Sequence, residues 1–452
     1  MVLIRSLLAL LLLTLVGGAV AQPTPGVTLI RGAHVFDGSG SAARVRDVLV
    51  RGGQIVRVAR RIRPPADARV VEAKGMTLLP GLHDLHIHTR SQAFTTPAAL
   101  TQQFAPYLAA GVTSINEYSV SGPMIAEIRA LAAQPGSVTP RLNLAVRLGV
   151  PHGHGTESQF TNAITAQVTT PEEARAAMAR LLPYRPDLVK VFADGWRYDD
   201  PGRTDRPSID EPTLAAVVEV AHRAGVPVVT HTVTLAGAKI AAQAGVDALV
   251  HGIGDKPVDA ELIRLMKRGG TAYVSTLVVY EPQQRRAQYP AEWAMLRAPD
   301  RAREERRNAE PVKPIEAWEA HRWKTLQDNL RALHRAGVRI GVGTDAGIGG
   351  VYHGWATIRE MIWLSRLGMS PREVLHAATA GSARIIGRQD RQGRIAPGLA
   401  ADLVLVGGRP DRDILDIYDV RRVWVGGRAV DIDAERRLRA EPVGEAPAET
   451  GH

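Results

Sequence analysis

A short sequence that recurs in the middle of the chain, Ala-Gly-Val, constrains the fold more than any other feature. Each copy follows an amphipathic stretch and precedes an apolar run. Glycine suits the left-handed residue that ends a helix, and valine favours the start of a strand. The recurrence therefore predicts repeated helix–strand units and a parallel sheet. The copies begin at Ala110, Ala224, Ala244 and Ala336.

Apolar runs in the same region indicate about eight strands. Eight parallel strands that alternate with helices predict an α/β fold, the (β/α)8 or TIM barrel, whose active site lies at the C-terminal ends of the strands. An open, doubly wound sheet is the structural alternative, but no glycine-rich phosphate loop follows the first strand. The expected strands begin near Thr77, Val112, Pro140, Asp187, Val226, Val246, Thr271 and Val338.

The two ends of the chain share a different pattern, in which short strand candidates are separated by glycine pairs. Strands are expected at 27–30, 48–50 and 55–58 before the barrel, and at 401–406 and 422–425 after it. Neither end is long enough to form a sandwich alone, so we expect one small β-sandwich domain built from both. The predicted domains are 22–79 and 396–433 for the β-sandwich, 80–395 for the barrel, and 434–452 for a loose polar tail.

Residues 1–21 have the pattern of a Sec-type signal peptide. Arg5 supplies positive charge, the run from Leu7 to Val16 is largely apolar, and Ala19-Val20-Ala21 is a small-x-small cleavage site. The run is too short for a membrane-spanning helix, although a retained membrane anchor is the alternative. We expect cleavage after Ala21 and a periplasmic or secreted protein that has no further membrane contact.

The 452 residues include no cysteine, so neither a disulfide nor a lipid-anchored cysteine is available. Export without disulfides is compatible with a bacterial periplasm. The formal net charge of +10 could attract nucleic acid or an anionic surface. The arginines are scattered, however, and no aromatic residues alternate with them as stacking platforms. The composition therefore predicts a solvated, arginine-rich surface and no nucleic-acid partner.

Chemically reactive side chains fall on the expected strands, mostly at their ends. His86 and His88 are two residues apart on a strand, so both side chains point the same way and can bind one metal ion. Taken singly, a histidine or lysine in such a place is usually structural, but the coincidence of six residues favours a common site. The others are Lys190 on the fourth expected strand, and His231, His251 and Asp345 at the ends of the fifth, sixth and eighth.

With these six residues in their sequence contexts, the chain resembles the amidohydrolase superfamily, in the imidazolonepropionase-like branch that includes secreted prolidases. The resemblance covers nearly the whole mature chain, and it implies the barrel and the split β domain. The motifs that carry it are Pro80 to His88, Val189 to Phe192, Gly343 to Gly347, His353-Gly354, Ala377 to Thr379, Gly393 to Gly398, and Ala401 to Leu403.

The resemblance implies a site for two divalent metal ions. His86, His88 and Asp345 would hold the first ion, and His231 and His251 the second. Lys190 would react with carbon dioxide to form a carbamate that bridges both. A hydroxide between the ions would attack a carbonyl, and Asp345 would pass its proton to the departing amine. Zinc is the expected metal, with manganese, cobalt and iron open as alternatives.

The resemblance implies hydrolysis of a carbon–nitrogen amide bond. Single-metal deaminases of the family lack the bridging lysine and place Glu three residues after the strand-five histidine, where this chain has Thr234. The expected small-molecule substrates carry a free carboxylate on the amine side: Xaa-Pro dipeptides, as for a dipeptidase, N-acyl amino acids, or ochratoxin-like amides. Hydrolysis of a cyclic amide or lactone is the enzymatic alternative, and a metal-binding pseudoenzyme or binding protein is the non-enzymatic one. A homo-oligomer is compatible with this class.

Some segments depart from the family pattern. The second strand usually ends in an Arg-Asp pair, but here the segment 113–118 has none. In the loop after the third strand, His152 and His154 could form another metal pair or have no role. We expect His154 to be catalytic, as a donor to the substrate or its oxyanion.

The remaining candidates are supported by position alone. His83 has the opposite strand parity to His86, so it should pack outside the site. The segment 281–335 is long for one connection and should be helical, covering the barrel mouth. Candidate substrate contacts are Arg147, Arg197, Tyr118, Tyr280 and Tyr352.

Overall fold

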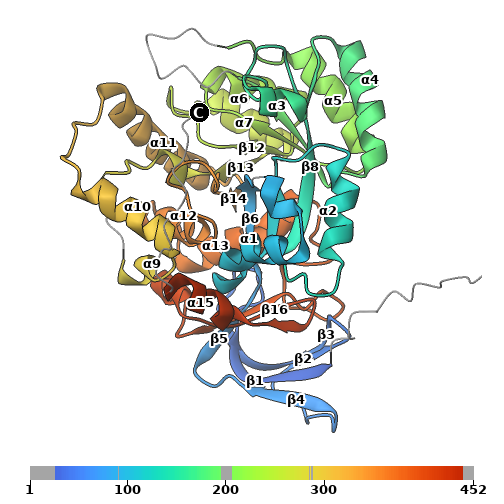
Figure 1. The fold of residues 1–452 in the computed structure, drawn as a ribbon, viewed down its shortest axis with the longest axis vertical. Coiled ribbons are helices and arrows are strands. Elements are labelled where there is room, and N and C mark those ends of the chain that lie inside the picture. Colours follow the sequence, from blue (N-terminus) through green and yellow to red (C-terminus); the bar gives the residue numbers. More distant parts are fainter. Residues whose placement is uncertain (1–25, 90, 195–205, 285, 287–288, 441–452) are drawn as a thin grey trace, which may run out of the picture.

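The computed structural model describes residues 26–440, except residues 90, 195–205, 285 and 287–288. A large barrel domain stands on a smaller sheet domain (Figure 1). No helix in the described part of the chain is long and apolar enough to cross a membrane. The expected signal segment lies outside the described residues.

Eight parallel strands form the wall of the barrel, as predicted, and helices surround them (Figure 1). The first and last strands meet through backbone hydrogen bonds: the N–H of Asp345 donates to the carbonyl of His86 (2.8 Å), and the N–H of His88 to that of Ala346 (2.7 Å). The strands, in their order around the wall, are β6 (Leu82–Ile87), β7 (Val112–Glu117), β8 (Arg141–Gly149), β10 (Leu188–Phe192), β11 (Val228–His231), β12 (Ala248–Val250), β13 (Ala272–Ser275) and β14 (Ile340–Val342).

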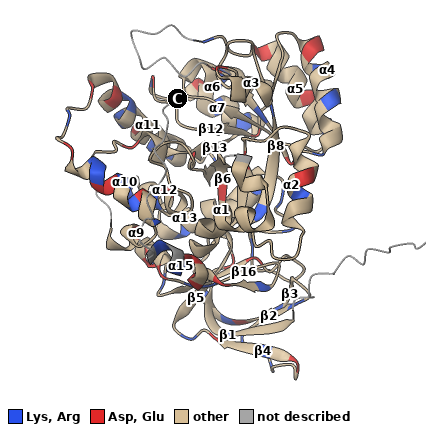
Figure 2. Ribbon diagram, in the orientation of Figure 1, with Lys and Arg blue, Asp and Glu red and all other residues tan. Residues whose placement is uncertain are grey.

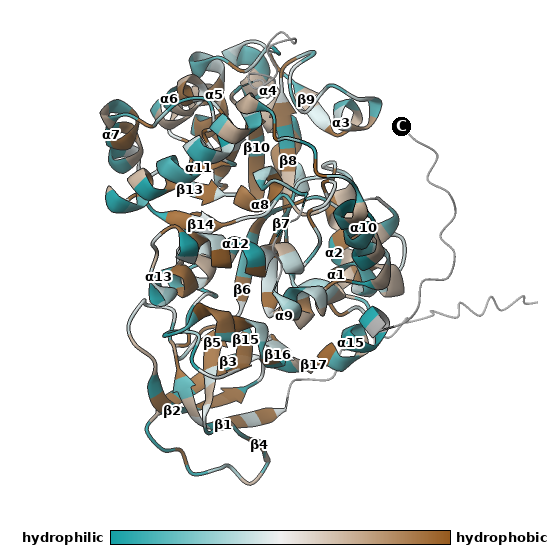
Figure 3. Cartoon of the chain, turned by 90° about the vertical axis from the view of Figure 1, so that its left-hand side faces the viewer, coloured by the Kyte–Doolittle hydropathy of each residue, from teal (hydrophilic) through white to brown (hydrophobic). Residues whose placement is uncertain are grey.

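The helices of the barrel turn apolar faces inward and polar faces outward, which Figure 3 shows as brown strands behind teal helix surfaces. All four Ala-Gly-Val copies have their glycine at positive φ just after a helix, as predicted. The main helices are α1 (Pro97–Ala109), α2 (Met124–Ala132), α4 (Pro171–Leu181), α5 (Glu211–Arg223), α6 (Leu235–Ala244), α7 (Ala260–Gly269), α12 (Trp355–Arg366) and α13 (Pro371–His376).

The prediction that the first barrel strand begins near Thr77 is wrong. Met76–Pro80 forms a separate strand, β5, which belongs to the smaller sheet, and the barrel strand β6 begins after Gly81. A Cβ atom at Gly81 would lie 1.8 Å from Thr113 Oγ1, so the chain can cross between the two sheets only where it has no side chain. The apolar run is therefore two strands in two domains.

The smaller sheet is built from both ends of the chain, as predicted. Strand β5 lies at its centre, parallel to β1 on one side and antiparallel to β15 on the other. The sheet curls, so that the N–H of Ile55 in β3 donates to the carbonyl of Leu399, just before β15. Its strands are β1 (Val27–Val35), β2 (Arg44–Arg51), β3 (Gln54–Ala59), β4 (Ala68–Glu72), β5, β15 (Leu403–Gly407), β16 (Val420–Val425) and β17 (Arg428–Val430).

The C-terminal segment differs from the loose tail that we expected from residue 434. Residues Ile432–Ala440 form helix α15, which packs against α1. Glu435 is buried and accepts two hydrogen bonds from Arg297, at 3.0 and 2.7 Å. This ion pair joins segments that are distant in sequence, and a local reading of a polar tail cannot reveal it.

The long connection between β13 and β14 is helical, as predicted. It contains α8 (Leu277–Tyr280), α9 (Pro290–Trp293), α10 (Ala298–Ala309) and α11 (Ala317–Arg335). Basic and acidic residues lie side by side on outer helices such as α4 and α10 (Figure 2).

A buried ion cluster ties this connection to helix α12. The guanidinium of Arg359, which is 1% exposed, donates to Glu281 (2.9 Å) and to Glu292 (2.8 Å). Both carboxylates are buried, and Glu292 also accepts a hydrogen bond from the Tyr418 hydroxyl at 2.8 Å. The cluster fixes the chain directly after Tyr280, a residue of the pocket described below.

Candidate metal centre and active site

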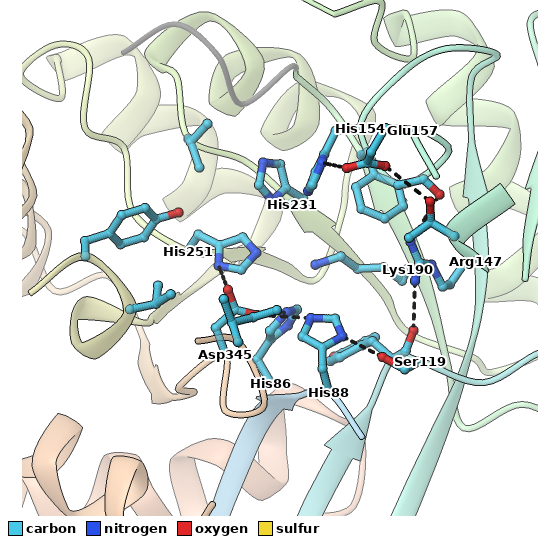
Figure 4. Close-up of a pocket in the computed structure, with 18 of the residues that line it drawn as sticks. His86, His88, Ser119, Arg147, His154, Glu157, Lys190, His231, His251 and Asp345 are labelled. Atoms are coloured by element: carbon cyan, nitrogen blue, oxygen red, sulfur yellow. Dashed lines mark hydrogen bonds and ion pairs between the residues drawn. The ribbon is translucent and has the colours of Figure 1, made fainter. Parts of the chain in front are cut away.

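The six predicted residues converge in one pocket at the C-terminal ends of the barrel strands (Figure 4). The pocket has a volume of about 530 Å³. His86 lies on β6, Lys190 on β10 and His231 on β11, while the others lie one to three residues after a strand. His88 follows β6, His251 follows β12, and Asp345 follows β14.

The first cluster consists of His86, His88 and Asp345. Asp345 Oδ1 lies 3.3 Å from His86 Nε2 and 3.0 Å from His88 Nε2. His86 Nε2 and Asp345 Oδ1 are both buried, and neither has a hydrogen-bond partner among the described residues. The three donor atoms lie within 4.8 Å of one another, so they can point at a common centre. This is the arrangement that a divalent ion requires.

The second cluster adjoins the first. The rings of His231 and His251 lie 4.6 Å apart, and the rings of His86 and His251 lie 4.7 Å apart. His231 Nε2 and Lys190 Nζ are buried without a hydrogen-bond partner among the described residues. Buried polar atoms without partners cost free energy, so their concentration here suits the binding of cations. The residues present therefore fit two divalent ions.

The protonation states also suit metal binding. Burial lowers the pKa values of His86 and His231 well below the ordinary value, and that of His251 to about 3. These imidazoles are therefore neutral and carry a free lone pair. Burial opposes ionisation of Asp345, but the surrounding imidazoles hold its pKa well below the usual range. The carboxylate is available as an anionic ligand.

The backbone is strained at two of the six residues. His251 has φ 79° and Asp345 has φ 64°, in the left-handed region that non-glycine residues seldom adopt. Each such residue costs about 1–3 kcal/mol, which the surrounding fold must offset. Gly347 allows the loop to pass His88 closely, because a Cβ atom there would lie 2.0 Å from the His88 carbonyl oxygen. The fold thus holds the side chains of His251 and Asp345 in fixed positions.

His154 lines the same pocket, as expected, while His152 does not. The ring of His154 lies 4.2 Å from that of His231, and its Nδ1 lies 2.8 Å from Glu157 Oε1. This hydrogen bond holds the pKa of Glu157 at about 2, although burial opposes it. His152 is exposed and points elsewhere, so the structure does not bring these two histidines together as a metal pair.

The sequence model of the group described as the Amidohydrolase family matches residues 77–430. The chain belongs to the amidohydrolase family. A candidate prolidase from Bifidobacterium longum has a similar solved structure, with TM-score 0.72 and 26% identity, over 93% of this chain and 100% of that one. The structure of Aspergillus niger ochratoxinase shares the fold at TM-score 0.70 and 22% identity, over 90% and 96% of the two chains.

Curated relatives of this amidohydrolase match over shorter regions. Ochratoxinase from Aspergillus niger is 27% identical over 270 residues, which are 57% of this chain and 49% of the relative. A dihydroorotase from Anaeromyxobacter dehalogenans is 42% identical over 64 residues, which are 14% of this chain and 15% of the relative. The chain thus spans about half the length of these relatives or less.

Several residues that support the site of this amidohydrolase were missed by sequence reasoning. Ser119 Oγ lies 2.8 Å from His88 Nδ1, and Glu117 accepts a hydrogen bond from the Ser119 N–H at 2.6 Å. Tyr118, which was expected only as a substrate contact, also stacks on His86, with ring centroids 4.5 Å apart. Glu117 ends β7, the strand that lacks the Arg-Asp pair, and Tyr118 and Ser119 follow it. A serine in a loop gives no sequence signal that distinguishes it from any other.

Replacing Ser119 with alanine should lower metal affinity and activity about 10- to 100-fold, because the His88 ring loses the partner that sets its orientation. Titration of the metal-free protein with zinc measures the affinity. The matched control is Ser41→Ala, in an exposed turn of the sheet domain. Equal affinities of the two variants would show that Ser119 does not orient His88.

The predicted substrate contacts have mixed outcomes. Arg147, Tyr118 and Tyr280 line the pocket, whereas the Tyr352 hydroxyl donates to Glu304 at 2.7 Å outside it. Arg197 lies outside the described residues. His83 is buried away from the pocket, as its strand parity predicted. The pocket also contains residues that we did not anticipate, among them Phe160, Arg322 and Ile348.

Proposed function

We propose that this amidohydrolase is a binuclear metal-dependent hydrolase that cleaves a carbon–nitrogen amide bond. One observation carries the proposal: buried polar atoms of His86, Lys190, His231 and Asp345 meet in one pocket, and within the described part of the chain they have no hydrogen-bond partner. A metal-binding pseudoenzyme is disfavoured, because a decayed site would have lost part of this set.

The ligand set divides between two ions, for which zinc is the first choice. His86, His88 and Asp345 would hold one ion, and His231 and His251 the other. Burial lowers the pKa of Lys190 to about 7, so a neutral amine is present near neutral pH. That amine can add to carbon dioxide and lose a proton, which gives an anionic carbamate able to bridge both ions. When bound, the two ions would supply Lewis acidity and an acidified water.

The chain itself supplies the proton transfers. The ionised Asp345 can accept a proton from the attacking water and deliver it to the nitrogen of the leaving amine. His154, held at Nδ1 by Glu157, faces the same pocket and can stabilise the oxyanion that develops on the carbonyl oxygen.

We infer that the substrate is a small amide with a free carboxylate in its amine half. Its volume of about 530 Å³ lies within the range of small-molecule sites. We propose Xaa-Pro dipeptides, N-acyl amino acids or ochratoxin-like amides as substrates. The names of the relatives, a candidate prolidase and an ochratoxinase, support this class. The match to dihydroorotases favours cyclic amides as the second candidate.

We also propose that residues 1–21 direct export, so that the enzyme acts in the periplasm or outside the cell. The pattern of Arg5, the apolar run and Ala19-Val20-Ala21 supports this. N-terminal sequencing of the protein from the cell envelope should find Gln22 first.

The function is tested by amine release from a panel of dipeptides, N-acyl amino acids and cyclic amides. The mature protein is loaded with zinc in the presence of bicarbonate. We expect release from the carboxylate-bearing members and its loss after treatment with a chelator. Release that persists in the metal-free protein, or no release from a protein that holds two metal ions per chain, would refute the proposal.

A further inference from the structure

The chemistry of His231 depends on which of its two ring nitrogens carries the hydrogen. The ring is neutral, so one nitrogen carries an N–H and the other a lone pair that can bind a metal ion. In His88, Nδ1 lies 2.8 Å from the hydroxyl oxygen of Ser119. In His251, Nδ1 lies 3.1 Å from the hydroxyl oxygen of Thr276. Both rings can donate from Nδ1 to these hydroxyls, which leaves Nε2 for an ion.

His231 has its polar neighbour at the opposite nitrogen. Oδ1 of the buried Asp194, two residues after β10, lies 3.6 Å from His231 Nε2. Within the described residues neither atom has a hydrogen-bond partner. The separation is longer than a hydrogen bond, and a small rotation of the ring would close it. A carboxylate oxygen attracts an N–H and repels a lone pair, so this neighbour favours the hydrogen on Nε2 and leaves the lone pair on Nδ1.

The carboxylate of Asp194 is fixed in this position by its second oxygen. Oδ2 accepts hydrogen bonds from the N–H groups of Val233 and Thr234, both at 2.8 Å, and from the Thr234 hydroxyl at 2.9 Å. These donors lie at the start of helix α6, whose N-terminus favours a negative charge. Gly237 makes the approach possible, because a Cβ atom there would lie 2.5 Å from Oδ2. With one oxygen held by the helix, the other remains directed at His231.

Asp194 also belongs to the segment that carries the proposed bridging lysine. Lys190 lies on β10, and Phe192 at the end of that strand pairs with His231 in β11. The N–H of Ala193 donates to the carbonyl of His231 at 3.1 Å. The backbone of one segment therefore sets the positions of both proposed ligands, and the side chain of Asp194 adds control of the His231 ring.

We propose that Asp194 is a positioning residue that keeps the hydrogen of His231 on Nε2, so that Nδ1 is the nitrogen left to bind the second ion. Asp194 is not one of the residues that line the pocket, so it acts through His231 and not on the substrate. The inference rests on the proposed binuclear site. It predicts that the affinity for the second ion depends on a carboxylate that does not touch the ion.

The first test replaces Asp194 with asparagine, which has nearly the same shape. The amide oxygen would keep the three hydrogen bonds from the start of α6, so the NH2 group would take the place of Oδ1. An NH2 group donates to Nε2 and moves the hydrogen of His231 to Nδ1, the nitrogen that the ion needs. Titration of the metal-free protein with zinc should show about 10- to 100-fold weaker affinity for the second ion, with the first ion unaffected.

The second test reads the hydrogen of His231 directly and includes the wild type. NMR of the nitrogen-labelled, metal-free protein distinguishes a ring nitrogen that carries hydrogen from one that does not, and the signals of His231 are those lost in His231→Gln. We expect hydrogen on Nε2 in the wild type and on Nδ1 in Asp194→Asn. Burial raises the pKa of Asp194 to about 7, so both tests are made about one pH unit above that value, where the carboxylate predominates.

The matched control is Asp210→Asn, the same substitution at the start of helix α5, where Asp210 accepts a hydrogen bond from the N–H of Thr213 at 3.0 Å. It should change neither the zinc affinity nor the position of the His231 hydrogen. Hydrogen on Nδ1 of His231 in the wild type, or binding of the second ion by Asp194→Asn as tightly as by the control, would overturn the inference and leave the binuclear site standing. A wild type that binds only one zinc ion per chain would overturn both.

Discussion

Replacing Lys190 with alanine is expected to reduce amide hydrolysis more than about 100-fold, beyond the loss typical for residues that merely support a ligand. The proposed carbamate of Lys190 is the anionic bridge between the two ions. Without it, Asp345 would be the only anion among the five remaining proposed ligands, which would hold two divalent charges. The metal content of the purified variant, measured by mass spectrometry, should fall with the activity.

A short carboxylic acid should restore part of what the Lys190→Ala variant loses. Acetate or propionate can occupy the space of the missing side chain and offer two oxygens to the ions. The control is Lys239→Ala, because Lys239 on α6 is paired with Asp259 and Glu261 away from the pocket. Full activity of Lys190→Ala without added acid would contradict the carbamate assignment.

Replacing Arg359 with methionine is expected to lower the free energy of unfolding by about 3–5 kcal/mol. The change leaves Glu292 buried without its cation, and it leaves Glu281 with Arg286 alone, whose Nε lies 3.7 Å from Glu281 Oε2.

Urea denaturation of wild type and variant measures this effect. The control is Arg372→Met, an exposed arginine in the first turn of α13, which should change stability by no more than about 0.5 kcal/mol. If Arg359→Met is as stable as the control variant, the cluster does not secure the connection between β13 and β14.

The barrel and the six candidate ligands were predictable because each depends on a local pattern. Apolar runs mark the strands, and His231 and His251 end such runs. The structure confirms that these residues meet, since the C-terminal ends of parallel strands share one rim. Their roles as ligands remain predictions of the resemblance and the geometry.

The remaining features depend on contacts between distant segments. The break at Gly81 arises from its contact with Thr113, and the apolar residues on either side look alike in sequence. Helix α15 is held by the pairing of Glu435 with Arg297. Arg322 could not be distinguished by type, because lysines and arginines number 56 in the chain. Only the fold shows that this one reaches the pocket.

The contact between the first and last barrel strands has a consequence for local opening of the barrel. The carbonyl of His86 accepts a hydrogen bond from the N–H of Asp345. The side chains of the same two residues belong to the first cluster, His86, His88 and Asp345. An ion bound there would link the first barrel strand to the segment that follows the last one. Local separation of these two segments would then release the ion. Bound metal would therefore stabilise the closed barrel by mass action. Hydrogen exchange at the amides of His88 and Asp345 should therefore slow when zinc binds.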